Sequence, residues 1–562
     1  WNLDDTPEGK DDEINPDVLG YIFEKYINQK EFGAYYTRPE ITEYLCDRTI
    51  NKLILDKVRF QERDKGLKPL VINDNDNLNE LLLRLDADLC DRLLNQILPN
   101  LTLLDPACGS GAFLVAAMKT LIGVYATVVS QARRFEDHPN IKKWLDEANS
   151  HPSLDYYIKK RIITDNLYGV DIMQEATEIA KLRLFLALVA SAKKVDELEP
   201  LPNIDFNIMA GNSLIGLIRV DEKGFDDLSK KSKGKAKKGF AHDPTQGNLL
   251  GRTVLQGNLL AGQDASEYRR ILDEKNKNIA LYKKHAFLSD AGRDRDHRSQ
   301  ESSVLVLRNE IDKLNRESQE KLNELLLKEF SNDLSIKFEE AQLTGKPKKR
   351  VLNIDDINVL EPFHWGYHFD KVFERGGFDA IIANPPWEIF KPQAKEFFAH
   401  HSELVTKNKM DIKTFEKEQK KLLESPDVAT AWLEYQSKFP YVSSYFRSAE
   451  DYKNQISVVN GKKAGTDINL YKLFVERCYH LLRKGGECGI VIPSGIYTDL
   501  GTKQLREMLF SETEITGLFC FENRKAIFEG VDSRFKFIIL TFEKGSKTES
   551  FPTRFMRHDV TE

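Results

Sequence analysis

Cysteine is scarce in this 562-residue sequence, and its distribution excludes two kinds of site. The six cysteines are scattered, with no Cys-x-x-Cys pair and no cluster of histidines beside them. Disulfide frameworks and structural zinc sites need such closely spaced ligands, so neither is predicted. We expect reduced thiols and no metal.

Long apolar runs are also missing on inspection. No stretch approaches the ~18 consecutive apolar residues that span a bilayer. The first residues, Trp1–Asp12, are acidic, whereas a signal peptide begins basic and then turns apolar. We therefore expect a cytoplasmic protein without membrane contact.

The third shortage is positive charge. Lysine and arginine number 82 against 88 acidic residues, a net charge of -6 that excludes a uniformly basic nucleic-acid coat but leaves room for a local basic groove. With 41% hydrophobic and 30% charged residues the chain has the balance of a soluble globular protein. Its length predicts one large domain with insertions, or two to four domains.

Short apolar runs alternate with longer helical patterns, which is typical of a parallel α/β sheet. The predicted strands are Leu101–Asp105, Tyr168–Ile172, Ile204–Met209, Phe378–Ala383, Cys488–Pro493, Ile515–Phe521 and Phe535–Phe542. The last two are close enough in sequence to pair antiparallel, whereas the others need helical crossovers such as Gln174–Ala192 and Leu470–Arg483. We predict a doubly wound, seven-strand Rossmann-like sheet with an antiparallel last strand.

Long segments without a strand pattern interrupt this sheet at Lys119–Ile163, Arg219–Leu352 and Glu388–Asp467. We predict a helical N-terminal region at 1–99 and the first half of the core at 100–218. A basic, helical insertion follows at 219–352, a core strand with its motif at 353–387, a second helical insertion at 388–467 and the rest of the core at 468–562. Helical spacing in Glu267–Lys284 and Ser303–Phe330 predicts a helical hairpin in the first insertion.

A glycine-rich turn follows the first predicted strand. Asp105-Pro-Ala-Cys-Gly-Ser-Gly111 leads into a helix, and glycine lets the backbone approach a bound ligand closely. A nicotinamide site is disfavoured because Leu114 stands where its third glycine belongs and no acidic residue ends a strand about 20 residues further on. Asp171 ends the second strand, where it would accept hydrogen bonds from a ribose or cap the following helix; the two roles are compatible.

A second motif, Asn384-Pro-Pro-Trp387, follows the strand Phe378–Ala383 and therefore lies at the carboxyl edge of the sheet, where doubly wound folds bind ligands. The prolines remove two amide donors, so their carbonyls and the Asn384 side chain present acceptors to an incoming amine. An aromatic amine is a poor nucleophile because its lone pair is delocalised into the ring. Acceptors on its hydrogens localise that lone pair toward a methyl donor, while Trp387 offers a stacking surface.

These motifs occur in the order typical of one enzyme family. Glu31–Pro39, Asp105–Gly111, Tyr168–Asp171, Gly211–Leu214, Asn384–Trp387, Gly485–Pro493 and Ile527–Phe535 resemble the motifs of gamma-group amino-methyltransferases. The resemblance is strongest to the large adenine methylases of type IIG restriction-modification enzymes and of the BREX and DISARM phage-defence systems. It implies a methyltransferase that moves a methyl group from S-adenosylmethionine to N6 of a flipped adenine in DNA.

The resemblance also assigns residues. The implied cofactor set is Tyr36, Thr37, Pro39, Asp105, Ala107, Gly109, Gly111, Asp171, Ile172, Asn212 and Ser213. The implied catalytic set is Asn384, Pro385, Pro386 and Trp387, with Phe528 as the candidate for packing on the other face of the base. Trp387 stands where tyrosine or phenylalanine is commoner.

Several alternatives stay open at this stage. The tetrapeptide Asn-Pro-Pro-aromatic also marks enzymes that methylate RNA bases or glutamine amides, although the Phe32–Pro39 motif and the chain length favour DNA adenine. Cytosine N4 usually goes with Ser-Pro-Pro. An oxidoreductase and a non-catalytic module that senses cofactor or DNA are the remaining classes. No nuclease motif is found, since the Glu-x-Lys spacing is absent after Pro16-Asp17.

The expected partner is double-stranded DNA, together with a specificity domain or other subunits of a defence system. Two basic runs are candidates for phosphate contacts, although solvated loops are the more common reading of such runs. They are represented by Lys230 and Lys231 in one run and by Lys348, Lys349 and Arg350 in the other.

Overall fold

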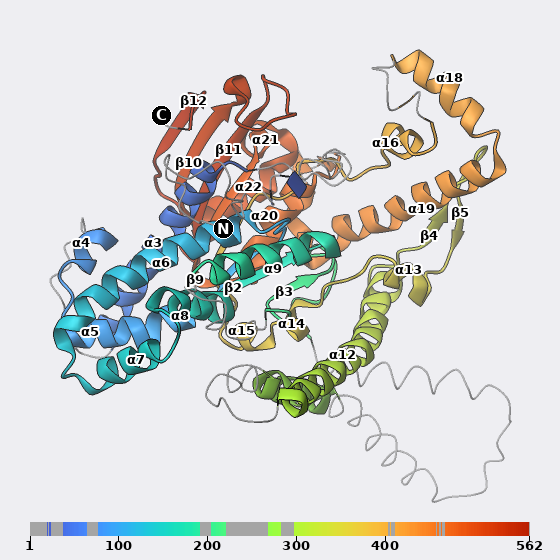
Figure 1. The fold of residues 1–562 in the computed structure, drawn as a ribbon. Helices are drawn as coiled ribbons and strands as arrows, with labels where there is room; N and C mark the ends of the chain where they lie inside the picture. Colours follow the sequence, from blue (N-terminus) through green and yellow to red (C-terminus); the bar gives the residue numbers. More distant parts are fainter. Residues whose placement is uncertain are drawn as a thin grey trace, which may run out of the picture.

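The computed structural model describes residues 20, 22–23, 37–64, 77–191, 204–220, 268–282, 297–402, 405, 411–456, 458–459, 462–463 and 467–560. Its centre is one eight-stranded sheet with the order β12-β10-β11-β9-β6-β1-β2-β3 (Figure 1). The strands are β1 Leu103–Asp105, β2 Leu167–Asp171, β3 Ile208–Ala210, β6 Phe378–Ala383, β9 Leu482–Pro493, β10 Thr513–Glu522, β11 Lys536–Lys544 and β12 Thr553–Arg557.

All neighbouring strands of this sheet run parallel except β11, which lies antiparallel between β9 and β10. The doubly wound sheet with seven predicted strands and an antiparallel member is therefore confirmed. An eighth strand, β12, lies at the edge of the sheet beside β10 and was not predicted from the sequence. Phe555 and Met556 in β12 are about half exposed, so this edge strand lacks the buried apolar alternation that makes a strand recognisable.

The sheet reverses its direction of winding between β1 and β6. From β1 the chain moves outward through β2 to β3, and later from β6 outward through β9. Because crossovers between parallel strands are right-handed, this reversal places helices on both faces and opens a crevice at the carboxyl ends of β1 and β6. The register pairs Asp105 with Gly169 and Asp171 with Ala210, so these strand ends share one edge.

The helices of one face are α3 (Pro39–Asp64), α6 (Ala112–Ala132) and α9 (Gln174–Val189). Helix α3 packs on α6, β6 and β9, and a Cβ on Gly489 of β9 would lie 2.8 Å from Leu45 and Thr49 of α3. The other face carries α20 (Leu470–Leu481) against β9 and α22 (Lys503–Glu512) against β10. Strand β6 is buried along its whole length between these layers, which explains its nearly continuous apolar sequence.

Helix α6 corrects one expectation. The segment Ala112–Phe135 is long and apolar enough to cross a membrane by length and composition, whereas the sequence analysis found no such run. Most of it is buried inside the protein, in contact with α3, α5 and α9. A core helix that is covered on several sides needs apolar residues around most of its circumference, and this accounts for its composition.

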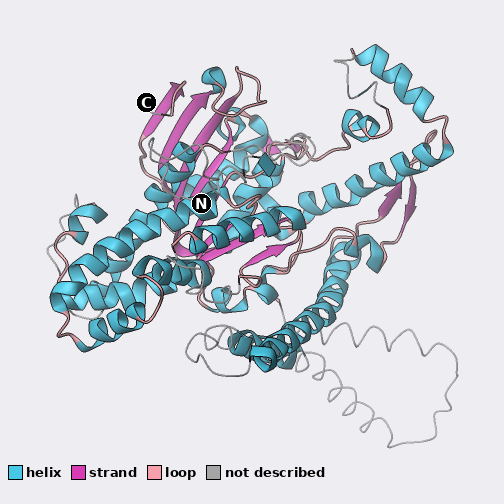
Figure 2. Ribbon diagram, viewed as in Figure 1, coloured by secondary structure: helices cyan, strands magenta, loops and turns pink. Residues whose placement is uncertain are grey.

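Helices dominate the remaining chain (Figure 2). The N-terminal region adds α4 (Leu78–Leu82) and α5 (Ala87–Arg92), and α7 (Pro139–Asn149) and α8 (Leu154–Arg161) follow α6. In the first insertion a helix at 268–282 and α12 (His297–Lys328) occupy the two segments for which a helical hairpin was predicted. Next come the hairpin β4 (Phe338–Glu340) and β5 (Lys348–Arg350), then α13 (Ile354–Asn358), α14 (Trp365–His368) and α15 (Asp370–Glu374).

The second insertion contains α16 (Ala394–Ala399), α18 (Ile412–Leu422) and the long helix α19 (Pro426–Ser448). In Figure 1, α19 extends from the sheet toward α18, and it contacts β4 of the first insertion. Two short strands, β7 (Val458–Val459) and β8 (Lys462–Lys463), lead to α20, and α21 (Gly495–Thr498) follows β9. The two insertions therefore meet each other beside the carboxyl edge of the sheet.

Candidate active site

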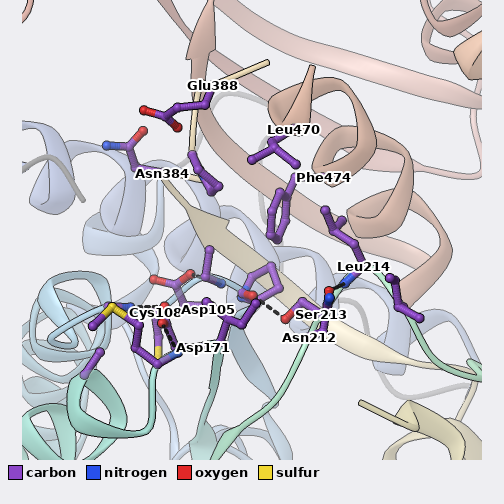
Figure 3. A pocket seen from close by; sticks show the side chains of 18 of the residues that line it. Asp105, Cys108, Asp171, Asn212, Ser213, Leu214, Asn384, Glu388, Leu470 and Phe474 are labelled. Carbon is purple, nitrogen blue, oxygen red and sulfur yellow. Dashed lines mark hydrogen bonds between the residues drawn. The ribbon is translucent and has the colours of Figure 1, made fainter. Parts of the chain in front are cut away.

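One cavity of about 480 Å³ lies at the carboxyl edge of the sheet. Its walls include the turn after β1, the ends of β2 and β3 and the turn after β6 (Figure 3). The predicted residues that line it are Thr37, Asp105, Ala107, Gly109, Asp171, Ile172, Asn212, Ser213, Asn384 and Pro386. The tertiary structure thus joins both motifs in a single space, although about 270 residues of sequence lie between Gly111 and Asn384.

The glycine turn after β1 requires glycine at two positions. Gly109 and Gly111 have φ values of +49° and +85°, in the left-handed region that residues with a Cβ rarely adopt. A Cβ at Gly111 would also lie 2.9 Å from the Cβ of Ala180 in α9. Gly111 is therefore needed for close packing of α6 against α9, while Gly109 faces open space.

Replacing Gly111 by alanine is expected to lower the free energy of unfolding by about 1–3 kcal/mol, because it combines backbone strain with a steric clash. Urea denaturation followed by circular dichroism would measure this loss. Gly123→Ala is the matched control: it lies in the middle of α6, an added Cβ meets nothing within 4 Å, and helix propensity favours alanine. Equal stability of both variants would contradict this account of the turn.

Two carboxyl groups, the buried Asp105 and the half-buried Asp171, flank the turn. Asp171 accepts hydrogen bonds from the amides of Gly109 at 2.8 Å and Met173 at 3.0 Å. It therefore fixes the glycine turn and the backbone just before α9. The predicted cap on this helix is wrong, because Met173 is the N-cap residue and no side chain caps the first turn. Asp105 accepts from the amide of Ala107 at 3.0 Å. Burial raises the pKa of both carboxyl groups, so a cationic ligand group beside them would favour their ionised forms.

The loop after β3 forms another wall. Ser213 donates from its hydroxyl to the carbonyl of Pro106 at 2.6 Å, which ties this loop to the glycine turn. The Asn212 side chain accepts from the amide of Leu214 and donates to the carbonyl of Leu360. Asn212 and Ser213 are thus held in place by the protein, and both contribute to the cavity wall.

The Asn384 carboxamide is fixed by partners on both sides. Its Nδ2 donates to Thr37 Oγ1 at 3.0 Å, and its Oδ1 accepts from Trp387 Nε1 at 3.0 Å. Because the indole nitrogen can only donate, Oδ1 must face Trp387, and this sets the orientation of the amide. A carbonyl oxygen has two lone pairs, so Oδ1 keeps the capacity to accept one more hydrogen bond.

Trp387 and Phe528 lie in an aromatic cluster. The Trp387 ring stacks on Phe535 at 5.4 Å and meets Phe528 edge-on at 5.0 Å. Both side chains are buried, and Asn523 hydrogen-bonds both the amide and the carbonyl of Phe528. In this arrangement no base has room between the rings, so stacking of a base on Trp387 or Phe528 stays a prediction that requires the rings to separate. Pro385 is buried in the same turn.

The N-terminal motif is described only from Thr37 onward, so the prediction for Tyr36 lies outside the described residues. Thr37 is buried and bonds Asn384, while Pro39 begins α3 and lines a small space next to the main cavity. Arg38 donates to the carbonyl of Ala526 at 2.9 Å. The motif therefore connects the Asn384 turn with the loop that carries Phe528.

The predicted phosphate contacts that the structure describes do not line the cavity. Lys230 and Lys231 lie outside the described residues, and Lys348, Lys349 and Arg350 form β5. Arg350 forms two hydrogen bonds with Asp356, at 2.6 and 2.7 Å, and Lys349 pairs with Glu339 at 2.6 Å. These partners already compensate the charges of Arg350 and Lys349. Lys348 is exposed, and no ion pair is observed for it among the described residues.

Sequence reasoning missed the apolar wall of the cavity. Leu470 and Phe474 are four residues apart in α20 and lie on the same helix face, and Phe390, Val442 and Phe446 come from the second insertion. The i, i+4 spacing at the start of α20 is a signal that sequence analysis can use. No comparable signal connects α19 with the site, because its contribution depends on how the insertion folds back over the sheet.

The strand order, the glycine turn and an Asn-Pro-Pro-Trp turn at neighbouring strand ends define an α/β Rossmann-like methyltransferase. Family models agree: the Eco57I restriction-modification methylase model matches residues 165–427 and 440–528, and the model of the MmeI DNA-methyltransferase domain matches 86–214. The chain belongs to the Eco57I restriction-modification methylase family. The gamma-group, type IIG-like resemblance seen in the sequence is thereby confirmed.

Two relatives illustrate this membership. A predicted type II restriction enzyme and methyltransferase of Methanocaldococcus jannaschii, RM.MjaORFECS2P, is 32% identical over 414 residues, which cover 70% of this chain and 32% of the relative. The type II restriction enzyme and methyltransferase RM.Eco57I of Escherichia coli is 26% identical over 36% of this chain and 18% of the relative. The chain thus corresponds to less than a third of the length of either.

Among solved structures, a DrdV–DNA complex overlaps 97% of this chain and 30% of its own chain, with 9% identity and a TM-score of 0.36.

Proposed function

We propose that this protein methylates N6 of adenine in DNA, with S-adenosylmethionine as the methyl donor. The observation that carries the proposal is the shared cavity, in which the glycine turn with Asp171 and the Asn384 turn line the same 480 Å³. Methyl transfer in one displacement step needs donor and acceptor in line and in contact. A donor bound beside the glycine turn and Asp171 and an amine bound at the Asn384 turn would meet in this cavity.

The residues present fit the cofactor. Asp171 would accept from the ribose hydroxyls, and Asp105 would balance the ammonium group of the methionine part, with Ala107, Gly109 and Gly111 close to its backbone. Ile172, Leu214 and Phe474 offer apolar surface for the adenine ring, with Asn212 and Ser213 at its polar edge. Thr37 and Pro39, with Tyr36, would enclose the methionine end. The bound donor supplies an electrophilic methyl group on a sulfonium.

The Asn384 turn would hold the nucleophile. Asn384 Oδ1 and the Pro385 carbonyl would accept hydrogen bonds from the two N–H groups of the amine, which turns the nitrogen lone pair away from the ring and toward the methyl group. Thr37 and Trp387 keep the carboxamide from rotating, so the acceptor is in place before the substrate arrives. Trp387 and Phe528 would stack on the base once it displaces Phe535 from the Trp387 face.

A base in a duplex must leave the helix to reach this cavity, at a cost of a few kcal/mol that protein–DNA contacts offset. Double-stranded DNA is therefore the proposed substrate. Two relatives carry restriction enzyme and methyltransferase in their names, which supports a role in restriction-modification or phage defence. A specificity domain or further subunits would then choose the target sequence.

The direct test incubates the protein with tritiated S-adenosylmethionine and unmethylated bacterial genomic DNA, and then separates the nucleosides after digestion. Label in N6-methyldeoxyadenosine is the expected result. Label in N4-methyldeoxycytidine, or in RNA or protein when these are offered instead, would replace the adenine proposal. Retention of NAD but not of S-adenosylmethionine would replace the methyltransferase mechanism itself.

Replacing Asp171 by asparagine is expected to weaken cofactor binding about tenfold, since one charge-assisted hydrogen bond to the ribose becomes neutral. The amide oxygen can still accept from Gly109 or Met173, so the fold should persist. Equilibrium dialysis with tritiated S-adenosylmethionine measures the change, and Asp155→Asn, a half-exposed carboxylate in the first turn of α8, is the control. An unchanged dissociation constant would exclude Asp171 from ribose binding.

A further inference from the structure

Glu388 directly follows the Asn384–Trp387 turn and lines the same cavity. Figure 3 shows its side chain beside Asn384, at the end of the pocket away from Asp105 and Asp171. Its backbone is fixed, because its carbonyl accepts from the amide of Leu470 at 3.0 Å and the next residue, Ile389, bridges to Asn469. The start of α20 therefore holds Glu388 at the same end of the cavity as the amine acceptors.

One oxygen of the Glu388 carboxyl group is available to a ligand. The amides of Trp387 and Glu388 itself interact with the carboxyl group. The oxygen Oε2 is buried and has no hydrogen-bond partner among the described residues. Burying an oxygen without a partner is costly, so such a group in a ligand cavity points to a hydrogen bond made with the ligand.

The surroundings of Glu388 shift its protonation equilibrium toward the neutral form, relative to a free carboxyl group. Burial raises the pKa of its carboxyl group, the Glu396 carboxylate of α16 acts in the same direction, and the two backbone amides oppose the rise. Lys438 of α19 also lines the cavity, as do Asp105 and Asp171 at the opposite end. A neutral carboxyl group carries an O–H donor, which none of the amine acceptors in the Asn384 turn can supply.

Resting on the function proposed above, we propose that Glu388 is a base-specificity residue whose carboxyl O–H donates to the ring nitrogen next to the amine-bearing carbon of the flipped base. In adenine this nitrogen is N1, which is an acceptor. Guanine and thymine have N–H donors and carbonyl oxygens at the corresponding positions, so they would fail at both Asn384 and Glu388. Cytosine shares the amine and acceptor pattern, and its smaller ring must be excluded by other contacts.

The test compares Glu388→Gln with Glu388→Ala in single-turnover transfer from tritiated S-adenosylmethionine to unmethylated bacterial genomic DNA. Glutamine keeps a donor, so its rate should stay within about threefold of the wild type, whereas alanine should lower it about tenfold or more. Cofactor affinity should not change in either variant. Glu396→Gln, outside the cavity lining, is the matched control and should keep the wild-type rate at acidic pH.

The pH profile separates donation from a structural role. Wild-type transfer should fall as pH rises through the raised pKa of Glu388, because the ionised group cannot donate, whereas the Gln variant should not show this fall. Three results would each overturn this role: an equal loss of transfer rate in the Gln and Ala variants, the same pH–rate profile for the wild type and the Gln variant, or a loss of cofactor affinity. If the wild-type protein labels no adenine, the proposed function itself is refuted. If the wild type labels adenine and the Glu388 variants transfer at the wild-type rate, only the role of Glu388 is refuted.

Discussion

Replacing Asn384 by alanine is expected to reduce methyl transfer by about 10²- to 10³-fold, the range seen when one preorganised polar group is removed from an active site. The variant loses the acceptor that holds one amine hydrogen, and Trp387 Nε1 loses its 3.0 Å partner. Asp105 and Asp171 are untouched, so binding of S-adenosylmethionine should persist. The measurement is transfer of tritium to unmethylated DNA, alongside equilibrium dialysis of the labelled donor.

Two further variants sharpen this prediction. Asn95→Ala removes an asparagine that bonds Asp91 on the surface and should retain the wild-type rate. Trp387→Phe keeps an aromatic ring but frees Asn384 Oδ1 to rotate, so its rate should fall to an intermediate value. Full activity of Asn384→Ala would exclude the turn as the amine site, and simultaneous loss of donor binding would show that the cavity itself had collapsed.

Replacing Lys52 by methionine is expected to lower the free energy of unfolding by about 3 kcal/mol at neutral pH, the lower end of the cost of leaving a buried charge, here Glu487, without its partner. Lys52 of α3 pairs with Asp56 at 2.8 Å, with Glu543 of β11 at 2.6 Å and with Glu487 of β9. Oxygen atoms of these three carboxylates lie within 4.8 Å of one another. Without the ammonium group they repel each other beneath α3.

The loss should depend on pH. Burial raises the pKa of Glu487 in the folded state, while Lys52 opposes the rise. Without Lys52 the folded pKa lies above the unfolded one, so stability falls as pH rises through that interval and is largely kept below it. Urea denaturation at acidic and alkaline pH measures this, with exposed Lys313→Met as control. Equal losses at both pH values would argue against carboxylate repulsion.

Three residues of this site were predictable from the sequence because each lies at the end of a predicted strand. Asp105, Asp171 and Asn384 each follow an apolar run that forms a strand, and parallel strands place their carboxyl ends at one edge. Local sequence was therefore sufficient to expect these three residues near each other. The left-handed turn at Gly109 and Gly111 was equally local, since only glycine adopts it without strain.

Other features depended on contacts between distant segments. The hydrogen bond from Asn384 to Thr37 spans 347 residues, and the stacking of Trp387 on Phe535 joins separate motifs. Helix α19 was expected only as part of an insertion, yet Val442 and Phe446 form part of the cavity wall. No periodicity within α19 distinguishes residues that face a ligand from residues that face a core.

The sequence by itself determined the approximate positions of seven strands along the chain, the turn residues at their ends and the family, because propensity, glycine conformation and motif order act over a few neighbouring residues. Only the tertiary structure decided which face of Asn384 is held, that Trp387 and Phe528 are buried together, and that Glu388 carries an unpartnered oxygen in the cavity. These properties arise from burial and packing, and burial is decided by segments that are remote in the chain.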